Sequence, residues 1–209
     1  LLGVLDKTKT AMGARLIKKM LREPLNDADK INDRLDAVEE IYLDPLLEND
    51  LVESLKKIYD FERLAARIAT GTANGKDLIA LRNSIAVLPN IKADLSSTGS
   101  NLLKDIHDGI SNLEDIADLI TESISENAGF TIKEGGLIID GYSEDLDNLK
   151  ASIKDAKAWI AGLEAHERER TGIKTLKVGY NKVFGYYIDV TRANSDLVPE
   201  DYIRKQTLV

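Results

Sequence analysis

The sequence of 209 residues contains no cysteine, and this absence excludes several kinds of site. The chain cannot form a disulfide, use a thiolate nucleophile or hold zinc through thiolates, and it fits a reducing cytosol. Histidine is also scarce: only His107 and His166 are present, and neither has a second histidine or a carboxylate at ligand spacing on an evident apolar face. We therefore expect both histidines at the surface and no metal centre.

Long apolar runs are missing as well. Runs such as residues 78–81 fall far short of the roughly 18–20 apolar residues that cross a bilayer, and no secretion signal is visible at the N-terminus. With 43% hydrophobic residues, the sequence can still bury a core in one or two domains. The chain begins at Leu1 without a methionine and stops at Val209 inside what the pattern predicts to be a strand, so we expect a fragment of a longer protein.

Charge is distributed unevenly along the chain. The formal net charge is −8, but residues 171–209 hold six basic and four acidic side chains, which leaves a net charge of −10 for residues 1–170. Within the basic part, residues 174–187 read KTLKVGYNKVFGYY, with three lysines, no acidic residue and several aromatic residues. This pattern predicts a basic β-hairpin carried by an acidic helical body.

Hydrophobic periodicity predicts a mainly α-helical body. Three pairs of residues are typical of helix starts: Asn26 with Asp29, Asp44 with Pro45, and Asn74 with Asp77. The expected helices cover residues 11–22, 27–42, 45–58, 61–69, 76–88, 101–106 and 113–123. Residues 130–141 predict a small hairpin or an extended connector around two adjacent glycines.

A long, rod-like helix is expected over residues 142–170. Its apolar residues alternate spacings of three and four, which is a heptad pattern: Leu146, Leu149, Ile153, Ala156, Ile160 and Leu163. Such a seam must bury against something, so we expect two antiparallel helices with a β-domain at their tip, the second helix lying outside this chain. Trp159 lies beside the seam and is expected to pack against neighbouring helices, and Glu164 with Arg168 is expected to form an ion pair on the exposed helix end.

Two further patterns, a glycine-rich segment and several acidic clusters, resemble a nucleotide-binding loop and catalytic carboxylates, but neither meets the requirements of such a site. Residues 71–77 resemble a phosphate-binding loop, but three residues instead of four separate Gly71 from Gly75, and Asp77 stands where that motif needs Ser or Thr. Asn74 serves better as the cap of the next helix. The acidic clusters along the chain are explained by solvated helix faces. We therefore expect no catalytic residue in this chain.

The predicted hairpin offers the only candidate binding residues. Its lysines and the next predicted strand supply cations for phosphates, and two amides supply hydrogen-bond donors: Lys174, Lys177, Lys182, Arg204 and Lys205, with Asn181 and Gln206. Such contacts would position a nucleic acid rather than read its sequence. The alternative interpretation is a half-buried strand whose lysines only protect an edge, and the pattern alone leaves it open.

Three segments resemble the MutS family of DNA mismatch-repair recognition proteins. Residues 10–24 (TAMGARLIKKMLREP) are similar to the start of the MutS core, residues 138–149 (IIDGYSEDLDNL) to the entry of its lever helix, and residues 169–188 to the entry of its clamp. Their order and spacing agree across essentially the whole chain. The resemblance implies a mainly α core and lever domain over residues 1–170 and the first part of a small antiparallel β clamp domain over residues 171–209.

The resemblance also implies a function. In the family the clamp contacts double-stranded DNA without regard to sequence, and this carries over to Asn181, Lys182, Arg204, Lys205 and Gln206. The chain would not be an enzyme and would need no cofactor. The ATPase that uses ATP and magnesium would lie elsewhere in the parent, which would form a homodimer, work with a MutL-type partner in the bacterial cytoplasm near the nucleoid, and need no membrane. The alternative from another class is a helical protein-interaction scaffold of a MutS-like protein without repair activity.

Overall fold

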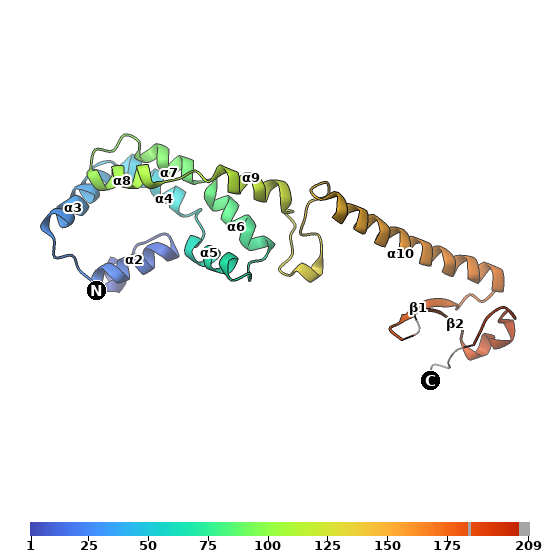
Figure 1. Cartoon of the computed structure of the whole chain (residues 1–209). Coiled ribbons are helices and arrows are strands. Elements are labelled where there is room, and N and C mark those ends of the chain that lie inside the picture. The colour runs from blue at the N-terminus through green and yellow to red at the C-terminus, as the bar shows by residue number, and fades with distance from the viewer. Residues whose placement is uncertain (184, 205–209) are drawn as a thin grey trace. The chain divides into compact units, whose positions relative to one another are not determined.

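The computed structural model describes residues 1–183 and 185–204, and in them the predicted mainly α fold class is confirmed (Figure 1). The chain forms two compact units, Leu1–Tyr142 and Ser143–Val209. The division of the parent's functions between residues 1–170 and 171–209 stays a prediction, because compactness does not test it.

The first unit is built from short helices. They are α1 (Leu2–Leu5), α2 (Ala11–Arg22), α3 (Ala28–Leu43), α4 (Pro45–Leu55), α5 (Phe61–Ala69), α6 (Gly75–Ile85), α7 (Leu88–Leu95), α8 (Asn101–Gly109), α9 (Glu114–Ser123) and the 3-10 helix η1 (Ile132–Glu134).

Local side-chain caps explain where several of these helices begin. Asp44 caps α4, and Pro45 fills its first position, where no backbone donor is needed. Asn74 and Asp77 form a reciprocal capping box at α6: Asn74 Oδ1 accepts from the amide of Asp77 at 3.0 Å, and Asp77 Oδ2 accepts from the amide of Asn74 at 2.8 Å. Both predicted starts are confirmed.

Two expectations about helix boundaries are corrected. The cap of α3 is Asp27 rather than Asn26, because Asp27 Oδ1 accepts from the first free amides of the helix. The helix expected over residues 76–88 ends at Ile85, and a separate helix, α7, begins at Leu88. Pro89 occupies the first turn of α7, where proline fits a helix well.

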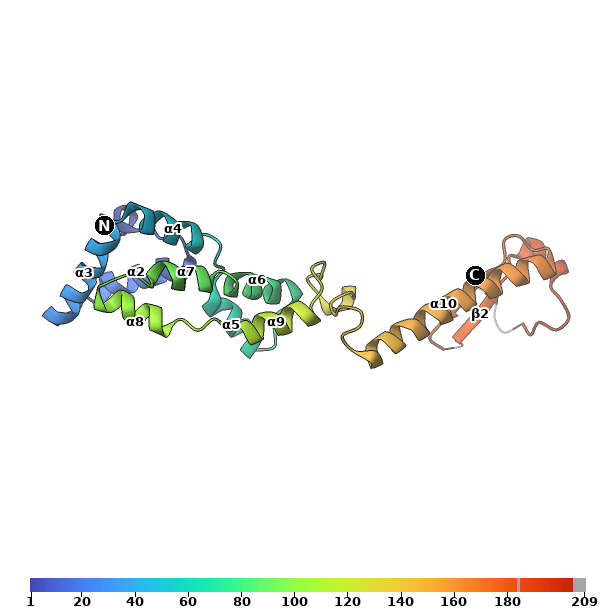
Figure 2. The ribbon, with the colours of Figure 1, turned by 90° about the horizontal axis from the view of Figure 1, so that it is seen from above.

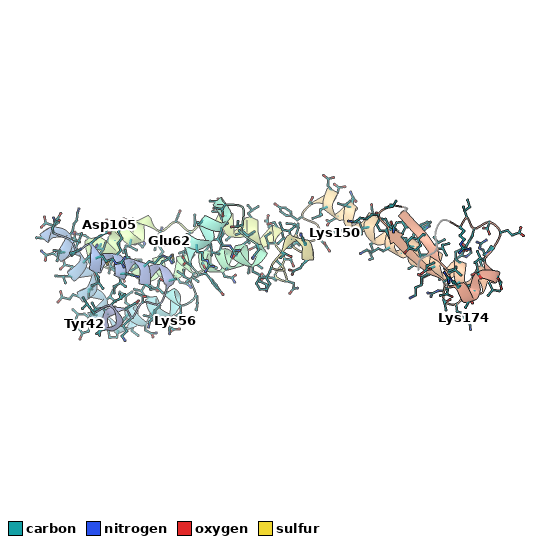
Figure 3. The ribbon with its side chains drawn as sticks, turned by 90° about the horizontal axis from the view of Figure 1, so that it is seen from below. Tyr42, Lys56, Glu62, Asp105, Lys150 and Lys174 are labelled. Carbon is teal, nitrogen blue, oxygen red and sulfur yellow. The ribbon has the colours of Figure 1, made fainter. Side chains whose placement is uncertain are left out.

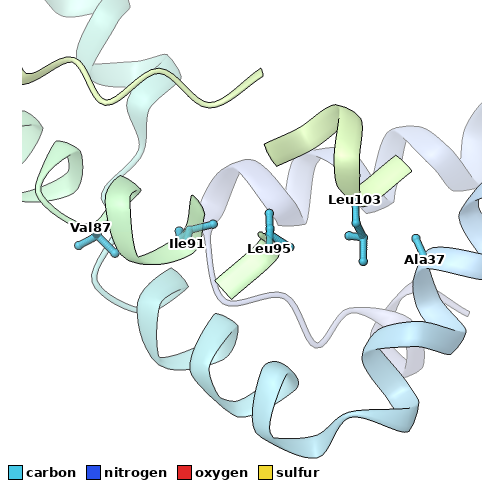
Figure 4. Close-up of a cluster of buried hydrophobic side chains, with 5 residues drawn as sticks. All are labelled: Ala37, Val87, Ile91, Leu95 and Leu103. Carbon is cyan, nitrogen blue, oxygen red and sulfur yellow. The ribbon is translucent and has the colours of Figure 1, made fainter. Parts of the chain in front are cut away.

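The first unit buries two clusters of apolar side chains. The larger one joins α3, α7 and α8 (Figure 4) and consists of Ala37, Val87, Ile91, Leu95 and Leu103. The smaller one joins α9 to the following connector and consists of Ile120, Ile124 and Ala128, with side chains of α6 packed against it. These clusters hold together helices that would be marginal in isolation.

The connector after α9 is irregular and contains no hairpin in the described residues. Ile124 and Ile138 form an isolated antiparallel bridge, and η1 makes a single turn between them. Gly135 and Gly136 both have positive φ angles, 73° and 67°, which L side chains rarely adopt. Residues 130–141 are therefore neither a hairpin nor a fully extended connector, because a 3-10 turn and two glycines with positive φ angles interrupt the extended path.

The second unit consists of one long helix and a small hairpin (Figure 2). Its elements are α10 (Glu144–Thr171), β1 (Lys177–Asn181), β2 (Gly185–Asp189) and the 3-10 helix η2 (Arg192–Leu197). Ser143 caps α10 through a hydrogen bond of 3.4 Å from the amide of Leu146, and Gly172 ends it with φ 71°. No helix in the described part of the chain is long and apolar enough to span a membrane.

The predicted seam of α10 is largely exposed. Leu149 and Ile153 are 58% and 50% exposed, and all of residues 151–159 are classed as exposed. Trp159 is 68% exposed, so the expectation that it packs against a neighbouring helix is wrong for the described residues. The reason is that no described element covers the middle of α10, whereas its last turns carry the hairpin.

Candidate nucleic-acid interface

The basic segment forms the predicted antiparallel hairpin. β1 pairs with β2 from Lys177 opposite Asp189 to Asn181 opposite Gly185. Asn181 Oδ1 accepts from the amide of Val183 at 2.8 Å, a local bond that favours a turn, and Gly185 has φ 75° where the chain re-enters the sheet. The hairpin therefore turns at Asn181 and Lys182, as the sequence predicts.

The structure places the candidate cations along the hairpin. Lys174 lies in the turn between α10 and β1, Lys177 begins β1, and Lys182 lies in the hairpin turn. All three are exposed, and Figure 3 shows Lys174 at the margin of its unit. β1 spans about 13 Å at ~3.3 Å per residue, so Lys177 and Lys182 present positive charge near its two ends.

The remaining candidates lie at the end of the described chain. Arg204 is exposed, but residues 202–204 form no strand, so the expected second basic strand is not found in the described residues. Lys205 and Gln206 lie outside the described residues. The hairpin lysines and Asn181 are thus the candidates whose structural setting is defined.

Two exposed features near these lysines were missed by sequence reasoning. Tyr180 and Tyr186 are cross-strand neighbours with ring centroids 5.1 Å apart, and each is 62% exposed. From the sequence, the alternation of aromatic residues in this segment is also typical of a half-buried strand. The pairing of the two rings depends on the register between β1 and β2, which is a non-local property. Arg192 is also exposed at the start of η2, which is fastened beside the hairpin by a hydrogen bond of 2.8 Å from Asn194 Nδ2 to Thr175 Oγ1.

An ion pair near the end of α10 holds the beginning of the hairpin. Arg168 Nη2 lies 2.6 Å from Glu164 Oε1, which confirms the predicted pair. Both side chains also bind backbone of the hairpin segment: Arg168 Nε donates to the carbonyl of Leu176 at 2.7 Å, and Glu164 Oε2 accepts from the amide of Val178 at 3.0 Å. The pair is therefore a joint between helix and strand as well as a feature of the helix surface.

A second polar cluster fastens the end of the described chain to the same helix. Glu167, only 8% exposed, accepts hydrogen bonds from the Tyr202 hydroxyl and from Arg170 Nε, the latter at 2.8 Å. Arg170 also pairs with Asp201 at 3.0 Å and lies over the ring of Tyr202, 5.3 Å from its centroid. These four side chains form what we call the clasp.

The clasp perturbs the titration of its members. The hydrogen bond from Tyr202, followed by that from Arg170, lowers the pKa of Glu167 below its ordinary value of 4.5. Burial, followed by the hydrogen bond to Glu167, raises the pKa of Tyr202 above 10.0. Hydrogen bonds to Tyr202, Glu167 and Asp201 raise the pKa of Arg170. At neutral pH Glu167 is therefore a carboxylate, Arg170 a guanidinium and Tyr202 a neutral phenol.

The described residues contain no group of three or more His, Asp or Glu side chains that could hold a metal ion.

The resemblance of residues 71–77 to a phosphate-binding loop is explained by helix capping and packing. Asn74 and Asp77 are committed to the capping box, and a Cβ at Gly75 would lie 2.5 Å from the Cβ of Ala128. Gly75 is thus required by the close approach of the connector. Neither residue type nor geometry fits ATP with magnesium here.

Comparison with known proteins identifies the family of this chain. Residues 1–200 match the family model of MutS domain III. The chain belongs to the MutS family. It is 52% identical to the DNA mismatch repair protein MutS of Alkaliphilus oremlandii and to that of Desulforamulus reducens, and 49% identical to that of Clostridium perfringens.

These alignments cover 100% of the chain but only 24%, 24% and 23% of the three relatives. The MutS-family chain thus spans about a quarter of the length of the curated relatives it matches, and the resemblance stated from its sequence is confirmed.

Proposed function

We propose that this MutS-family chain supplies the lever and the first part of the clamp of a mismatch-repair protein. The hairpin grips double-stranded DNA through its phosphates without regard to sequence, and α10 links this grip to the rest of the protein. One observation carries the proposal: an exposed basic hairpin is fastened by side chains to the last turns of a 28-residue helix.

The contacts with DNA are electrostatic. Lys174, Lys177 and Lys182 neutralise phosphates. Asn181 donates a hydrogen bond from Nδ2 to the DNA backbone, because its Oδ1 already accepts a hydrogen bond within the turn. Arg204 adds a further cation, and Lys205 and Gln206, which lie outside the described residues, remain candidates from the sequence. Backbone contacts of this kind position DNA and leave mismatch recognition to other parts of the parent.

The lever is α10. A helix of 28 residues spans about 42 Å at ~1.5 Å per residue. The helix is stabilised by charges that interact favourably with its dipole: acidic residues lie in the first turn, and Arg168 and Arg170 lie in the last turn. Its exposed seam packs in the parent against a returning antiparallel helix, which stiffens the rod. Motion at one end is then transmitted to the hairpin through the ion pair and the clasp.

The parent supplies what this chain does not. ATP and magnesium bind to an ATPase outside these residues, the parent forms a homodimer, and a MutL-type protein is its repair partner. The relatives are named DNA mismatch repair proteins, which supports this assignment. Clamp engagement and ATPase state influence one another through a reciprocal coupling.

DNA binding is tested by fluorescence anisotropy of this chain with a homoduplex and a single-mismatch duplex across a salt series. We expect equal, weak binding to both duplexes and a log–log salt slope of about −3 to −4 for three or four phosphate contacts. Lys174→Glu/Lys182→Glu should reduce the magnitude of this slope by about 2. Lys18→Glu/Lys57→Glu is the matched control, because it changes the net charge equally at exposed lysines of the first unit.

Two results would contradict the clamp. If both double variants lose binding equally, only the overall charge matters. If the chain does not bind at about 50 mM salt, where phosphate contacts are strongest, the proposed lysines do not suffice for a grip.

The lever is tested in the whole parent polypeptide. Two glycines inserted after Ala156 interrupt α10 in its exposed middle, since glycine disfavours helix and the insertion changes the register. We expect ATP-induced sliding on DNA to become uncoupled from nucleotide binding while DNA binding itself persists. Unchanged coupling would show that α10 does not transmit the motion.

A protein-interaction scaffold is the second candidate function. The exposed apolar side chains of α10, among them Leu149 and Trp159, favour contact with another protein surface. If the DNA experiment fails while the unit remains folded, this candidate gains support.

A further inference from the structure

Helix α3 carries a second apolar face that no described residue covers. Its inner face enters the larger core cluster through Ala37, which is 4% exposed. On another face lie Ile31, Leu35, Val38 and Tyr42, exposed by 39%, 59%, 64% and 77% and spaced by four, three and four residues. We call these four residues the outer stripe. Figure 3 shows Tyr42 at the margin of the helical unit.

The orientation of α3 is fixed, so the outer stripe cannot turn inward. Glu40 Oε1 and Oε2 accept from the amides of Gly99 and Ser100 at 2.5 and 2.8 Å and thereby bind the segment that leads into α8. These bonds lower the pKa of Glu40, that from Gly99 first. Together with the burial of Ala37, they lock α3 against α8.

The stripe has the geometry of a helix-packing surface. Leu35, Val38, Glu39 and Tyr42 line a shallow hollow of about 380 Å³. These residues occupy positions i, i+3, i+4 and i+7, the four-residue hole into which one side chain of a facing helix inserts. A strand or an irregular segment does not match this repeat, so the geometry favours a helix as the occupant.

The border of the hollow is acidic. Asp36 and Glu39 both line it, and neither has an ion-pair partner among the described residues. An occupant with Lys or Arg beside its apolar residues would therefore be favoured over one with acidic flanks. A second copy of this chain would bring the same acidic border to the contact and carries a net charge of −8, which disfavours self-association.

We propose that the outer stripe seats an amphipathic, basic-flanked helix from a part of the same polypeptide outside these 209 residues. The length of chain available supports this choice, because the 209 residues correspond to about a quarter of the relatives they match. A tethered helix also has a high effective concentration at the stripe. The inference goes beyond the proposed function, and a hairpin that fails to bind DNA leaves it intact.

Thiol labelling of the whole polypeptide, with its own cysteines replaced, tests the proposal. Val38→Cys is compared between the whole polypeptide and the 209-residue chain, and Asp105→Cys on α8, exposed in this chain, serves as the control (Figure 3). We expect Val38→Cys to react at least about tenfold more slowly in the whole polypeptide, since a covered thiol is inaccessible, and Asp105→Cys to react equally in both.

A second variant guards against disturbance by the cysteine. Val38→Lys should lower the Tm of the whole polypeptide and leave that of the 209-residue chain unchanged, because the stripe is exposed only in the latter. Equal labelling rates and equal Tm values would overturn the proposal. Protection that requires a separate protein, or that rises with concentration of the 209-residue chain alone, would also overturn it, because the occupant would then be another molecule.

Discussion

The hydroxyl of Tyr202 donates a hydrogen bond to Glu167, a residue 35 positions earlier and nearly buried in the last turns of α10. Arg170 binds the same carboxylate and lies over the tyrosine ring. This contact returns the chain to the long helix after the hairpin and η2. The hairpin is thereby held at both of its ends, by Arg168 and Glu164 before it and by the clasp after it.

Removing the Tyr202 hydroxyl should loosen the segment that follows η2. In Tyr202→Phe, Glu167 loses a donor while most of the ring packing remains, so amide hydrogen exchange of residues 200–204 should accelerate by about tenfold. Ile203→Ala is the matched control, since Ile203 is 79% exposed and its truncation should leave exchange unchanged. Equal exchange in both variants would mean that the clasp does not hold this segment.

The clasp should also define a pH window. The pKa of Glu167 is lowered, so its stabilisation is present above about 4.5 and is lost as the pH falls through its folded-state pKa. The pKa of Tyr202 is raised, so its stabilisation is present below about 10.0 and is lost as the pH rises through its folded-state pKa. Amide protection of residues 200–204, after correction for intrinsic exchange, should decrease at pH values outside this window, and Tyr202→Phe should abolish the decrease at alkaline pH.

Leu176 should be the main apolar anchor between α10 and the hairpin. Its side chain is fully buried, so Leu176→Ala should lower the free energy of unfolding of the second unit by about 2–5 kcal/mol in urea denaturation. Val183→Ala, at a side chain 79% exposed, should change it by less than about 0.5 kcal/mol. A Leu176→Ala effect as small as that of the control would contradict this role.

Gly75→Ala should destabilise the first unit, because the new Cβ would meet the Cβ of Ala128 and a methyl of Leu137, each at 2.5 Å. Overpacking of this kind costs about 1–3 kcal/mol. Gly162→Ala is the matched control in α10, where nothing lies within 4 Å of the added Cβ and helix propensity should yield a gain of about 0.5–1 kcal/mol. Thermal unfolding of each variant distinguishes the two signs.

The sequence predicts those parts of the fold that depend on local chemistry. The starts at Asp44 and Asn74 were readable because a capping side chain acts within three residues, and the hairpin was readable from its turn at Asn181. The boundary between α6 and α7 was not readable in this way, because Pro89 lies in the first turn of α7 and does not mark the end of a helix. Periodicity thus located most helices but could not decide which side of a proline is helical.

Non-local relationships were beyond the sequence. Tyr202 and Glu167 form a contact only because the chain folds back through the hairpin, and no spacing rule indicates it. The heptad spacing of apolar residues along α10 is evident in the sequence. Whether these residues and Trp159 are covered depends on which other segments are present. The outer stripe of α3 was hidden for a related reason: one periodic pattern contains two faces, and only packing shows which of them is buried.

Trp159 is the single tryptophan of the chain, and its exposed position on α10 makes it a built-in optical probe. An indole in water emits at longer wavelength than one in an apolar contact, so anything that comes to lie along the middle of α10 should shift its fluorescence to the blue without any added label. The emission wavelength of Trp159 would then show whether the middle of α10 is covered by another segment or exposed to water.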